Sequence, residues 1–542
     1  MKSRIRRYFA VMLFLFASFL VIAQERLDMG LPCKELEKVA EMNGYGFIRV
    51  RKGKPLEAQM RQSKTVYVIS SIFDMGGRSF QFPDSSYIKF EEEGSIRNVM
   101  IKGKLLNDCL SPNQFGAIGD GKSDDTQALQ NVLNLNTSTI SLKGKKYLIN
   151  GFLTIPSNIS ILGENASIIF SDKEKVYPGI NIQSASRISI DGITFCAYKA
   201  KNSASPFSRK KGLLSSNRYA ITASSVRDLK IRNCSFADVE VAIKIDGGVG
   251  NNSNIDILNC STESSVNTPV YISHTDSAII NGCTLRASAD ASKYDHHIYG
   301  CSSNNHHVIS DCRFFDGVGI PIHYYTTETD GVDDIHVEHC SFENTCGAVI
   351  VSSGGEGRLE VTDVTMNSSR KYDNGIFRSG GKQSLIVDSA TINAPNQRLL
   401  SCEGINSVIK RTHAMVGGLV YGLPLAKGNL SIEGCEIKIL STPYLLYLSE
   451  KVAPITGNVV LKDNNISFDN TFEYLISVRG TTAGTIKFVN NEIWCNQKVQ
   501  YVVYNAGKTS KKLYVNNNYI KGVKELRHKS VRGSIIEKNI IE

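Results

Sequence analysis

The most constraining feature of this sequence is a repeat of about 27 residues that occupies most of the chain. Five cysteines recur at steps of 26, 23, 29 and 28 residues: Cys234, Cys260, Cys283, Cys312 and Cys340. Apolar residues two positions apart precede each cysteine, and a large apolar residue usually stands two positions after it. A repeat of this length with one recurring strand pattern indicates supersecondary units that stack on one another. No helical period competes with it.

The same position can be followed beyond the cysteines in both directions. It falls on Ile193, Val364, Ala390, His413, Cys435, Asn464, Asn491, Asn518 and Asn539. Apolar residues stand three before and two after it, with Lys410 and Thr262 as the exceptions. Stacked strands lie about 4.8 Å apart, so a column in the sequence becomes a line in space. We therefore predict an all-β chain, a single-stranded parallel β-helix (solenoid) from about Thr139 to Ile541.

The column also predicts what fills the core. The five cysteines are expected to be free, buried thiols, because neighbouring inward side chains point the same way and do not face each other. Toward the C-terminus the column changes to four asparagines, and stacked amides can form a hydrogen-bonded ladder along the axis.

Residues 1–23 are predicted to be a signal peptide. Basic residues open the chain, an apolar stretch follows from Tyr8 to Ile22, and Val21 and Ala23 fit the small-residue cleavage rule. No cysteine follows the cleavage site, which argues against a lipid anchor. We expect a secreted, periplasmic or cell-surface protein with no membrane insertion after cleavage and no nucleic-acid partner. Loss of the four signal charges leaves +6 of the formal +10, which suits acidic glycans or is ordinary surface charge.

Between the signal and the repeats, residues 24–110 are predicted to form an N-terminal β cap or first coil. A short helix is expected over residues 33–41, and strands begin at Thr65. Residues 111–542 are assigned to the β-helix. A helix over residues 124–135, with Asp124 or Asp125 as its cap, presents an apolar face that would seal the open end of the solenoid.

The segment FGAIGDGKSDDTQAL, residues 115–129, resembles the opening motif of the pectin-lyase-like (pectate lyase) superfamily, in the form found in Bacteroidetes. The resemblance implies a right-handed parallel β-helix that usually acts on carbohydrate, with the motif's carboxylates in structural roles. It does not fix the reaction, because the fold hosts several activities. The paired aspartates and the Gly-His-Gly of polygalacturonases are missing: the first pair falls on Glu240 and Val241.

Candidate functional residues gather where histidines are concentrated, since nine of the ten lie from His274 to His413. If Ile243, Ile298 and Ile322 point inward, alternation turns Lys244, Tyr299 and His323 outward, with His297 as a neighbouring outward residue. Two lengthened turns, residues 286–295 and 326–334, would wall a groove beside them. The predicted catalytic residues are His323, Tyr299, Lys244, Asp295 and Asp316. The predicted substrate-binding residues are His297, Tyr294, Tyr325, Arg286 and Lys293.

These residue types fit more than one activity. A base, a tyrosine acid and a cation are what β-elimination on a uronate needs. Hydrolysis would instead use two carboxylates, and the aspartates of these turns could equally bind Ca²⁺. Adjacent histidines such as His296 and His297 do not have zinc spacing. We place a polysaccharide lyase ahead of a glycoside hydrolase. The alternatives are a uronate epimerase and a non-catalytic, adhesin-like glycan-binding solenoid. No cofactor other than Ca²⁺ is expected.

Overall fold

The computed structural model describes most of the chain after the predicted signal peptide, which lies outside the described residues. The described ranges are 26–135, 137–171, 179–197, 219–247, 251–263, 266–287, 296–325, 334–402, 404–420, 428–442, 444–449, 457–469, 474–479, 484–499, 501–505, 513–523, 528–529 and 535–542. The chain divides into two compact units, one of residues 1–117 and 127–140, the other of residues 118–126 and 141–542. Each unit is described separately, and the capping role of the first stays a prediction.

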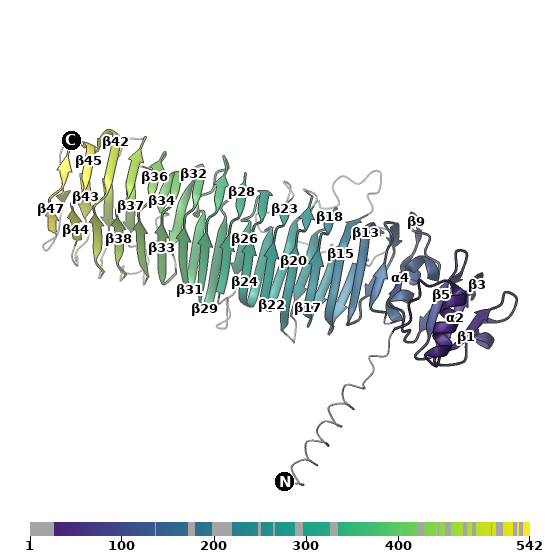
Figure 1. Cartoon of the computed structure of the whole chain (residues 1–542). Helices are drawn as coiled ribbons and strands as arrows, with labels where there is room; N and C mark the ends of the chain where they lie inside the picture. Colours follow the sequence, from purple (N-terminus) through teal and green to yellow (C-terminus); the bar gives the residue numbers. More distant parts are fainter. Residues whose placement is uncertain are drawn as a thin grey trace, which may run out of the picture. The chain divides into compact units, whose positions relative to one another are not determined.

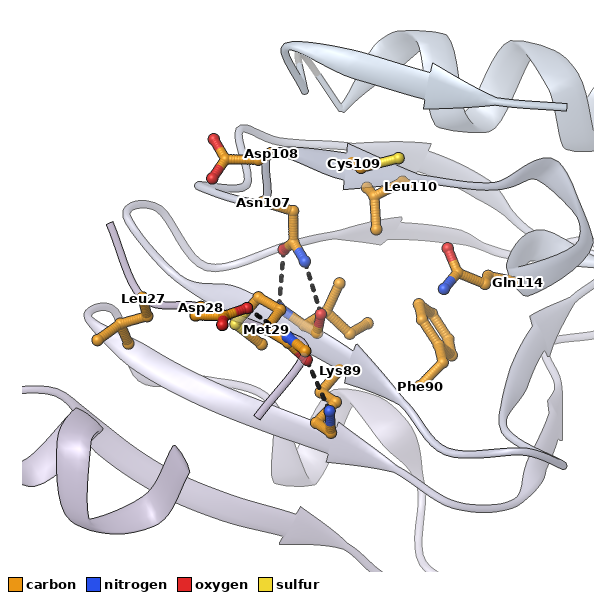
Figure 2. Close-up of a pocket in the computed structure, with 12 residues that line it drawn as sticks. Leu27, Asp28, Met29, Lys89, Phe90, Asn107, Asp108, Cys109, Leu110 and Gln114 are labelled. Atoms are coloured by element: carbon orange, nitrogen blue, oxygen red, sulfur yellow. Dashed lines mark hydrogen bonds between the residues drawn. The ribbon is translucent and has the colours of Figure 1, made fainter. Parts of the chain in front are cut away.

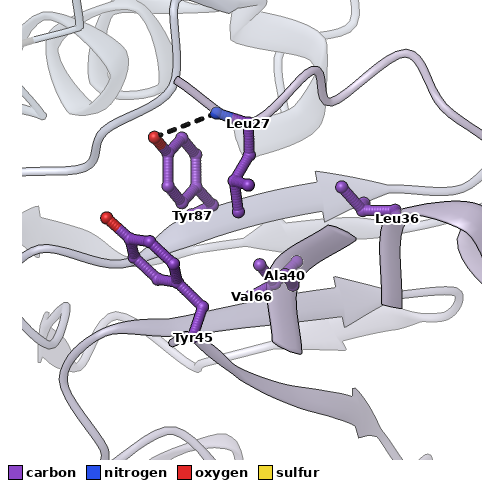
Figure 3. Close-up of a cluster of buried hydrophobic side chains, with 6 residues drawn as sticks. All are labelled: Leu27, Leu36, Ala40, Tyr45, Val66 and Tyr87. Atoms are coloured by element: carbon purple, nitrogen blue, oxygen red, sulfur yellow. Dashed lines mark hydrogen bonds between the residues drawn. The ribbon is translucent and has the colours of Figure 1, made fainter. Parts of the chain in front are cut away.

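The N-terminal unit is built on a parallel three-stranded sheet of β1 (Gly46–Val50), β2 (Thr65–Ile69) and β5 (Tyr87–Phe90). Helix α2 (Cys33–Met42) contributes Leu36 and Ala40 to a buried cluster, and the rings of Tyr45 and Tyr87 meet edge to face at 5.4 Å (Figure 3). The other elements before residue 117 are α3 (Leu56–Gln59), β3 (Ile72–Asp74), β4 (Ser79–Gln81), β6 (Ser95–Arg97), β7 (Met100–Lys102), β8 (Cys109–Leu110) and the 3₁₀ helix η1 (Pro112–Phe115).

The carboxylates of the family-like motif bind backbone amides. Asp125 is buried and accepts hydrogen bonds from the Ile118 and Gly119 N–H groups at 2.7 and 3.1 Å. Asp120, at the start of β9 (Asp120–Asp124), accepts two more from the turn that follows it. Asp124 accepts one from the N–H of Thr126, the first residue of α4 (Thr126–Asn134). These bonds give the motif carboxylates the structural role expected of them and confirm the helix predicted over residues 124–135.

The second unit is a parallel β-solenoid whose strands stack coil upon coil (Figure 1). Stack A holds the strands that precede the repeat column: β13 (Ile159–Phe170), β15 (Ser186–Ala197), β17 (Arg227–Arg232), β20 (Asn252–Leu258), β22 (Thr268–Asn281), β24 (Ile298–Ser310), β27 (Asp334–Glu338), β29 (Val349–Thr362), β31 (Phe377–Asp388), β33 (Asn406–Lys410), β35 (Asn429–Glu433), β38 (Val459–Lys462), β41 (Ile486–Val489), β44 (Leu513–Asn516) and β47 (Ile535–Glu537).

Two further stacks complete each coil, and the longer strands turn a corner from one stack into the next. Stack B follows the column: β11 (Lys146–Ile149), β18 (Ser235–Ala237), β21 (Ser261–Thr262), β23 (Thr284–Ala287), β25 (Arg313–Asp316), β28 (Ser341–Glu343), β30 (Thr365–Asn367), β32 (Thr391–Cys402), β34 (His413–Val420), β36 (Glu436–Ile439), β39 (Asn465–Phe468), β42 (Glu492–Val499), β45 (Tyr519–Val523) and β48 (Ile540–Ile541). Stack C holds β12 (Phe152–Thr154), β14 (Gly179–Gln183), β16 (Tyr219–Ser224), β19 (Val241–Asp246), β26 (Ile322–Tyr325) and the first residues of β22, β24, β29 and β31.

A separate four-stranded sheet contains β37 (Tyr444–Ser449), β40 (Tyr474–Arg479), β43 (Tyr501–Asn505) and β46 (His528–Lys529). Strand β10 (Thr139–Ser141) pairs with β8.

The cysteine column is buried as predicted. Cys234, Cys260, Cys283, Cys312 and Cys340 are each at most 2% exposed and are all free thiols. Each lies against backbone carbonyls, as Cys260 does with Ile231 O at 3.5 Å. The neighbouring thiols and burial raise the pKa of Cys260, so this thiol stays protonated at neutral pH.

The repeat column is misplaced by one residue in a single coil. Strand register pairs Thr391 with His413, which puts Thr412 in line with Ala390 and Cys435. Thr412 is fully buried, whereas His413 points outward. The apparent exception at Lys410 disappears with this correction, because Ile409 takes the inward place three residues earlier. A slip of one residue exchanges the two faces of a strand, so the error reverses the predicted direction of His413.

Candidate functional site

The outward face of stack C carries a column of large polar and aromatic side chains. Register pairs Lys244 with Tyr271, Tyr271 with Tyr299, and Tyr299 with His323. The rings of Tyr299 and His323 lie 5.6 Å apart, which confirms the predicted alignment of these two residues on adjacent coils. The column then continues through Ile350 to Arg378. Alternation within short strands predicted the outward direction of Lys244, Tyr299 and His323, but not Tyr271 or Arg378.

Lys244 is held between two tyrosines at one end of the column. Its ammonium lies 5.0 Å from the centre of the Tyr219 ring and 5.5 Å from that of Tyr271, and 3.3 Å from the Asp246 carboxylate. Cation–π contact of this kind fixes the amine above the aromatic faces. Tyr271 fills the predicted gap between Lys244 and Tyr299, and its hydroxyl lies 2.7 Å from Cys301 Sγ.

At the other end of the column, the hydrogen bonds of His296 and His323 determine which ring nitrogens carry protons. The carbonyl of Ile320 can only accept, so His296 Nδ1 carries the proton of their 2.8 Å bond. His296 Nε2 is then an acceptor, and His323 Nδ1 donates to it at 2.9 Å. His323 Nε2 is therefore left as a hydrogen-bond acceptor. Sequence reasoning missed His296, because it precedes strand β24 and its direction does not follow from strand alternation.

His323 is neutral in this environment. Burial, and then the neighbouring His296 and Arg378, lower the pKa of His323 to about 3. An imidazole with so low a pKa accepts hydrogen bonds but is a weak proton acceptor at neutral pH. The Tyr299 pKa is raised by burial, so its phenol stays protonated.

A pocket of about 330 Å³ opens beside His323. Its polar lining consists of His296, His323, Tyr325, Tyr372, Asn374 and Arg378, and the remaining lining residues are Val318, Gly319, Ile320 and Ile350. Tyr325 is 45% exposed, and its contact with a ligand stays a prediction. The described lining includes the charged side chain of Arg378. Sequence reasoning did not find Arg378, Tyr372 or Asn374, which come from the next two coils.

His297 does not point outward, and that prediction is wrong. It is fully buried, and its Nε2–H donates to Phe315 O at 2.9 Å. Burial lowers the pKa of His297 to about 4. His297 lies in the turn before β24 begins at Ile298, where the two-residue alternation of a strand does not yet apply. A buried imidazole of this kind cannot contact a polysaccharide.

The other predicted site residues lie apart from this pocket or outside the described residues. Arg286 and Asp316 belong to stack B, where they approach each other at 3.5 Å and the Arg286 guanidinium covers the Phe315 ring at 4.2 Å. Neither lines the pocket beside His323. Lys293, Tyr294 and Asp295 lie outside the described residues, as do most of the two predicted groove walls, so their roles stay predictions.

The remaining histidines of the cluster have structural partners. His307 is buried, with Nε2–H donating to Thr275 O at 3.1 Å and Nδ1 accepting from the Tyr324 hydroxyl at 2.8 Å. His306, His336 and His339 lie beside the carboxylates of Asp276, Glu360 and Asp363 on the outer surface of stack A.

A second pocket of about 330 Å³ lies within the N-terminal unit (Figure 2). Two of its polar side chains are bonded to the backbone: Lys89 Nζ donates to Met29 O at 2.6 Å, and the Asn107 amide bonds both the N–H and the carbonyl of Ile88. These bonds tie residues 27–30 and Asn107 to strand β5, so we assign the pocket no chemistry.

Neither a metal centre nor a membrane helix occurs in the part of the chain that the structure describes. No group of three or more histidine, cysteine, aspartate or glutamate side chains could hold a metal ion there. None of the described helices is long and apolar enough to cross a membrane. The aspartates considered for Ca²⁺ lie largely outside the described residues, and Ca²⁺ binding therefore stays a prediction.

Comparison with known proteins gives structural likeness only. No protein-family model matches the sequence, and no curated protein matches it. Among solved structures, the surface adhesin PfbA of Streptococcus pneumoniae is similar with a TM-score of 0.47 and 15% identity, over 70% of this chain and 92% of that one. A double mutant of the tailspike protein of E. coli bacteriophage HK620 gives a TM-score of 0.46 and 10% identity, over 80% and 79% of the two chains. Likeness at this level says nothing about ligand or reaction.

Proposed function

We propose that this protein is an exported, pectin-lyase-like β-helix that binds an acidic polysaccharide along the outward face of stack C. The observation that carries the proposal is the in-register column from Lys244 to His323, which ends beside a pocket containing Arg378. A row of side chains that crosses several coils suits an extended polymer better than a compact ligand.

The chemistry of the column fits sugars. The exposed ring of Tyr325 offers an aromatic face for the apolar side of a pyranose, and the half-buried rings of Tyr271 and Tyr299 offer their edges and hydroxyls along the same column. His323 Nε2 accepts a hydrogen bond from a sugar hydroxyl, and the Asn374 amide can both donate and accept. Arg378 suits a carboxylate on the ligand, because its guanidinium donates in a planar fork that matches the two carboxylate oxygens.

Binding without cleavage is preferred to elimination on this geometry, which reverses the order drawn from the sequence. A general base works best when its pKa lies near the working pH, and the pKa of His323 is about 3. A uronate lyase or epimerase is the second candidate, because Tyr299 lies beside His323 and Arg378 could neutralise a uronate carboxylate.

The proposal is tested by titrating the full mature chain with polygalacturonate, alginate and hyaluronan, with dextran as the neutral comparison, in a calorimeter. We expect binding to at least one acidic polymer and weaker binding as salt increases. Arg378→Gln should weaken that binding about tenfold or more. The matched control is Arg358→Gln, an exposed arginine of stack A that pairs with Glu360, and it should bind like the wild type. Absence of binding to all three acidic polymers would overturn the proposal.

The second candidate is tested on the same polymers by ultraviolet absorbance of an unsaturated product. Binding with no such product supports the non-catalytic proposal. A product that disappears in both Tyr299→Phe and His323→Ala, while both variants keep the wild-type melting temperature, would replace it with the lyase.

A further inference from the structure

The single tryptophan of the chain, Trp494, is presented on the outer face of stack B near the C-terminus. It is 37% exposed, and its orientation is fixed by neighbours. The indole N–H donates to Glu492 at 2.9 Å, the Lys521 ammonium lies 4.8 Å from the ring centre, and the Tyr519 ring meets it edge to face at 6.0 Å. A large aromatic ring held in one orientation is a ready contact surface, because little conformational entropy is lost when a ligand binds it.

The side of the ring away from Lys521 opens onto a hollow. Register places Lys521 on the coil after Trp494 and Ser467 on the coil before it. Ser467 is small, so the preceding coil leaves room beside the indole. A cavity of about 640 Å³ occupies this space, with Trp494 and Ser467 in its lining and Lys521 outside it. Its volume lies within the range of small-ligand sites.

The rest of the lining combines the apolar side chains of Ile392, Ala414 and Met415 with polar and charged ones. His413 Nδ1 lies 3.0 Å from Glu436 Oε2, and Asn465 follows Glu436 in the same outward column. Lys438, in the neighbouring column, pairs with the Asp469 carboxylate at 2.8 Å. The lining thus carries one carboxylate and one ammonium, each beside a partner, which disfavours an acidic ligand and leaves amide, carboxylate and ammonium groups for hydroxyls. From His413 to Trp494 the face crosses three coil steps, about 14 Å.

We infer that this hollow is a second carbohydrate site, one that binds a short neutral saccharide with a pyranose ring stacked on Trp494. It is independent of the proposed function, because it lies on another stack and uses none of the residues around His323. The protein would then hold two different glycans, an acidic polymer on stack C and a neutral saccharide on stack B.

The lone tryptophan makes the test direct, since all tryptophan fluorescence reports on the proposed site. The full mature chain is titrated with maltose, lactose, cellobiose and N,N′-diacetylchitobiose, and the emission maximum and intensity are followed. We expect a saturable change with at least one disaccharide, with a Kd in the roughly millimolar range because the site is open. Ser467→Tyr fills the hollow while keeping the reporter, and it should abolish the change.

Calorimetry with the same disaccharide provides a second measurement. Trp494→Ala should weaken binding about tenfold or more through loss of the stacking surface. Lys462→Ala, an exposed lysine on strand β38 of the preceding coil, is the matched control and should leave binding unchanged. Arg378→Gln should also leave it unchanged, which separates this site from the proposed function. If none of the four disaccharides alters emission or releases heat at tens of millimolar, or if Ser467→Tyr still responds, the inference is wrong.

Discussion

Two buried histidines, His297 and His307, are held neutral inside the solenoid. Burial lowers the pKa of each to about 4. At His307 both ring nitrogens are already bonded, so protonation would turn Nδ1 from an acceptor into a donor that faces the Tyr324 hydroxyl. At His297 the buried Nδ1 has no hydrogen-bond partner among the described residues, and a charge there would be unsolvated. The folded state therefore resists protonation at these two sites.

The low pKa of both histidines predicts that the folded state loses stability as the pH falls. The unfolded histidines titrate near pH 6.5, so between about pH 6.5 and pH 4 the unfolded chain binds more protons than the folded one. Stability contributed by these histidines is complete above pH 6.5 and is lost as the pH falls toward 4, by on the order of 3 kcal/mol for each group. Urea unfolding at pH 8, 6 and 4.5 should show the loss. His307→Gln should reduce the slope, and His339→Gln, on the exposed surface, should not. An equal slope in all three proteins would contradict the assignment.

The absence of a side chain at Gly300 leaves the space that Tyr324 of the next coil occupies. A Cβ at Gly300 would lie 2.1 Å from Tyr324 Cδ1 on the next coil, and Tyr324 is fully buried with its hydroxyl on His307. We predict that Gly300→Ala displaces Tyr324 and destabilises the chain by about 1–3 kcal/mol, as overpacking does. Gly151→Ala is the control, because its nearest new contact is an ordinary 3.6 Å. Thermal unfolding should show a clear drop for the first and little change for the second; equal melting temperatures would refute this account.

At the scale of elements, the asparagine ladder holds the C-terminal coils together. Asn464 Nδ2 donates to Asn491 Oδ1 at 2.9 Å, and Asn491 Nδ2 donates to Asn518 Oδ1 at 3.0 Å. Each amide also bonds the backbone of the preceding coil: Asn491 Oδ1 accepts from the Asn464 N–H, and Asn491 Nδ2 donates to Leu461 O. The ladder thus satisfies buried polar groups that an apolar column would leave unpaired.

Interrupting the ladder should loosen the coils around it. Asn491→Leu removes four hydrogen bonds and takes away the partner of the buried Asn464 backbone N–H, which predicts a loss of roughly 3 kcal/mol. Because a solenoid is coupled mainly between neighbours, hydrogen exchange should quicken in β38 to β45 and stay slow in β15 to β22. Asn490→Gly is the control, since Asn490 is exposed and has a positive φ of 56° that glycine tolerates. Uniformly faster exchange along the whole solenoid would argue against local coupling.

The solenoid as a whole should tolerate the removal of one complete coil. Deleting residues 464–490 joins Asp463 to Asn491 and preserves the register of the ladder, because Asp463 and Asn490 share the same turn geometry, with φ of 57° and 56°. We expect this variant to keep its β circular-dichroism spectrum and to melt within a few degrees of the wild type. Deleting residues 464–477 removes only part of a coil and should unfold the C-terminal strands, because inward and outward positions no longer match. Similar melting of the two deletions would contradict a modular solenoid.

The sequence by itself determined the repeat, and through it the parallel β-solenoid, the buried thiols, the asparagine ladder and the outward alignment of Tyr299 with His323. All of these follow from side chains that recur at one position of a regular strand, where alternation decides which face each occupies. The prediction went wrong where regularity ends: His297 lies in the turn before its strand, and in a coil shorter than the mean repeat the column was predicted at His413 but lies at Thr412.

Only the tertiary structure decided which chemistry surrounds those side chains. Arg378, Tyr372 and Asn374 reach the pocket of His323 from later coils. The hydrogen bond between His296 and His323 determines which ring nitrogens carry protons, and no pattern in the local sequence predicts this. The hollow beside Trp494 likewise depends on the small side chain of Ser467, which lies one coil and 27 residues earlier. Stacking brings residues a full repeat apart into contact, so the composition of a site depends on the length of every coil between its members.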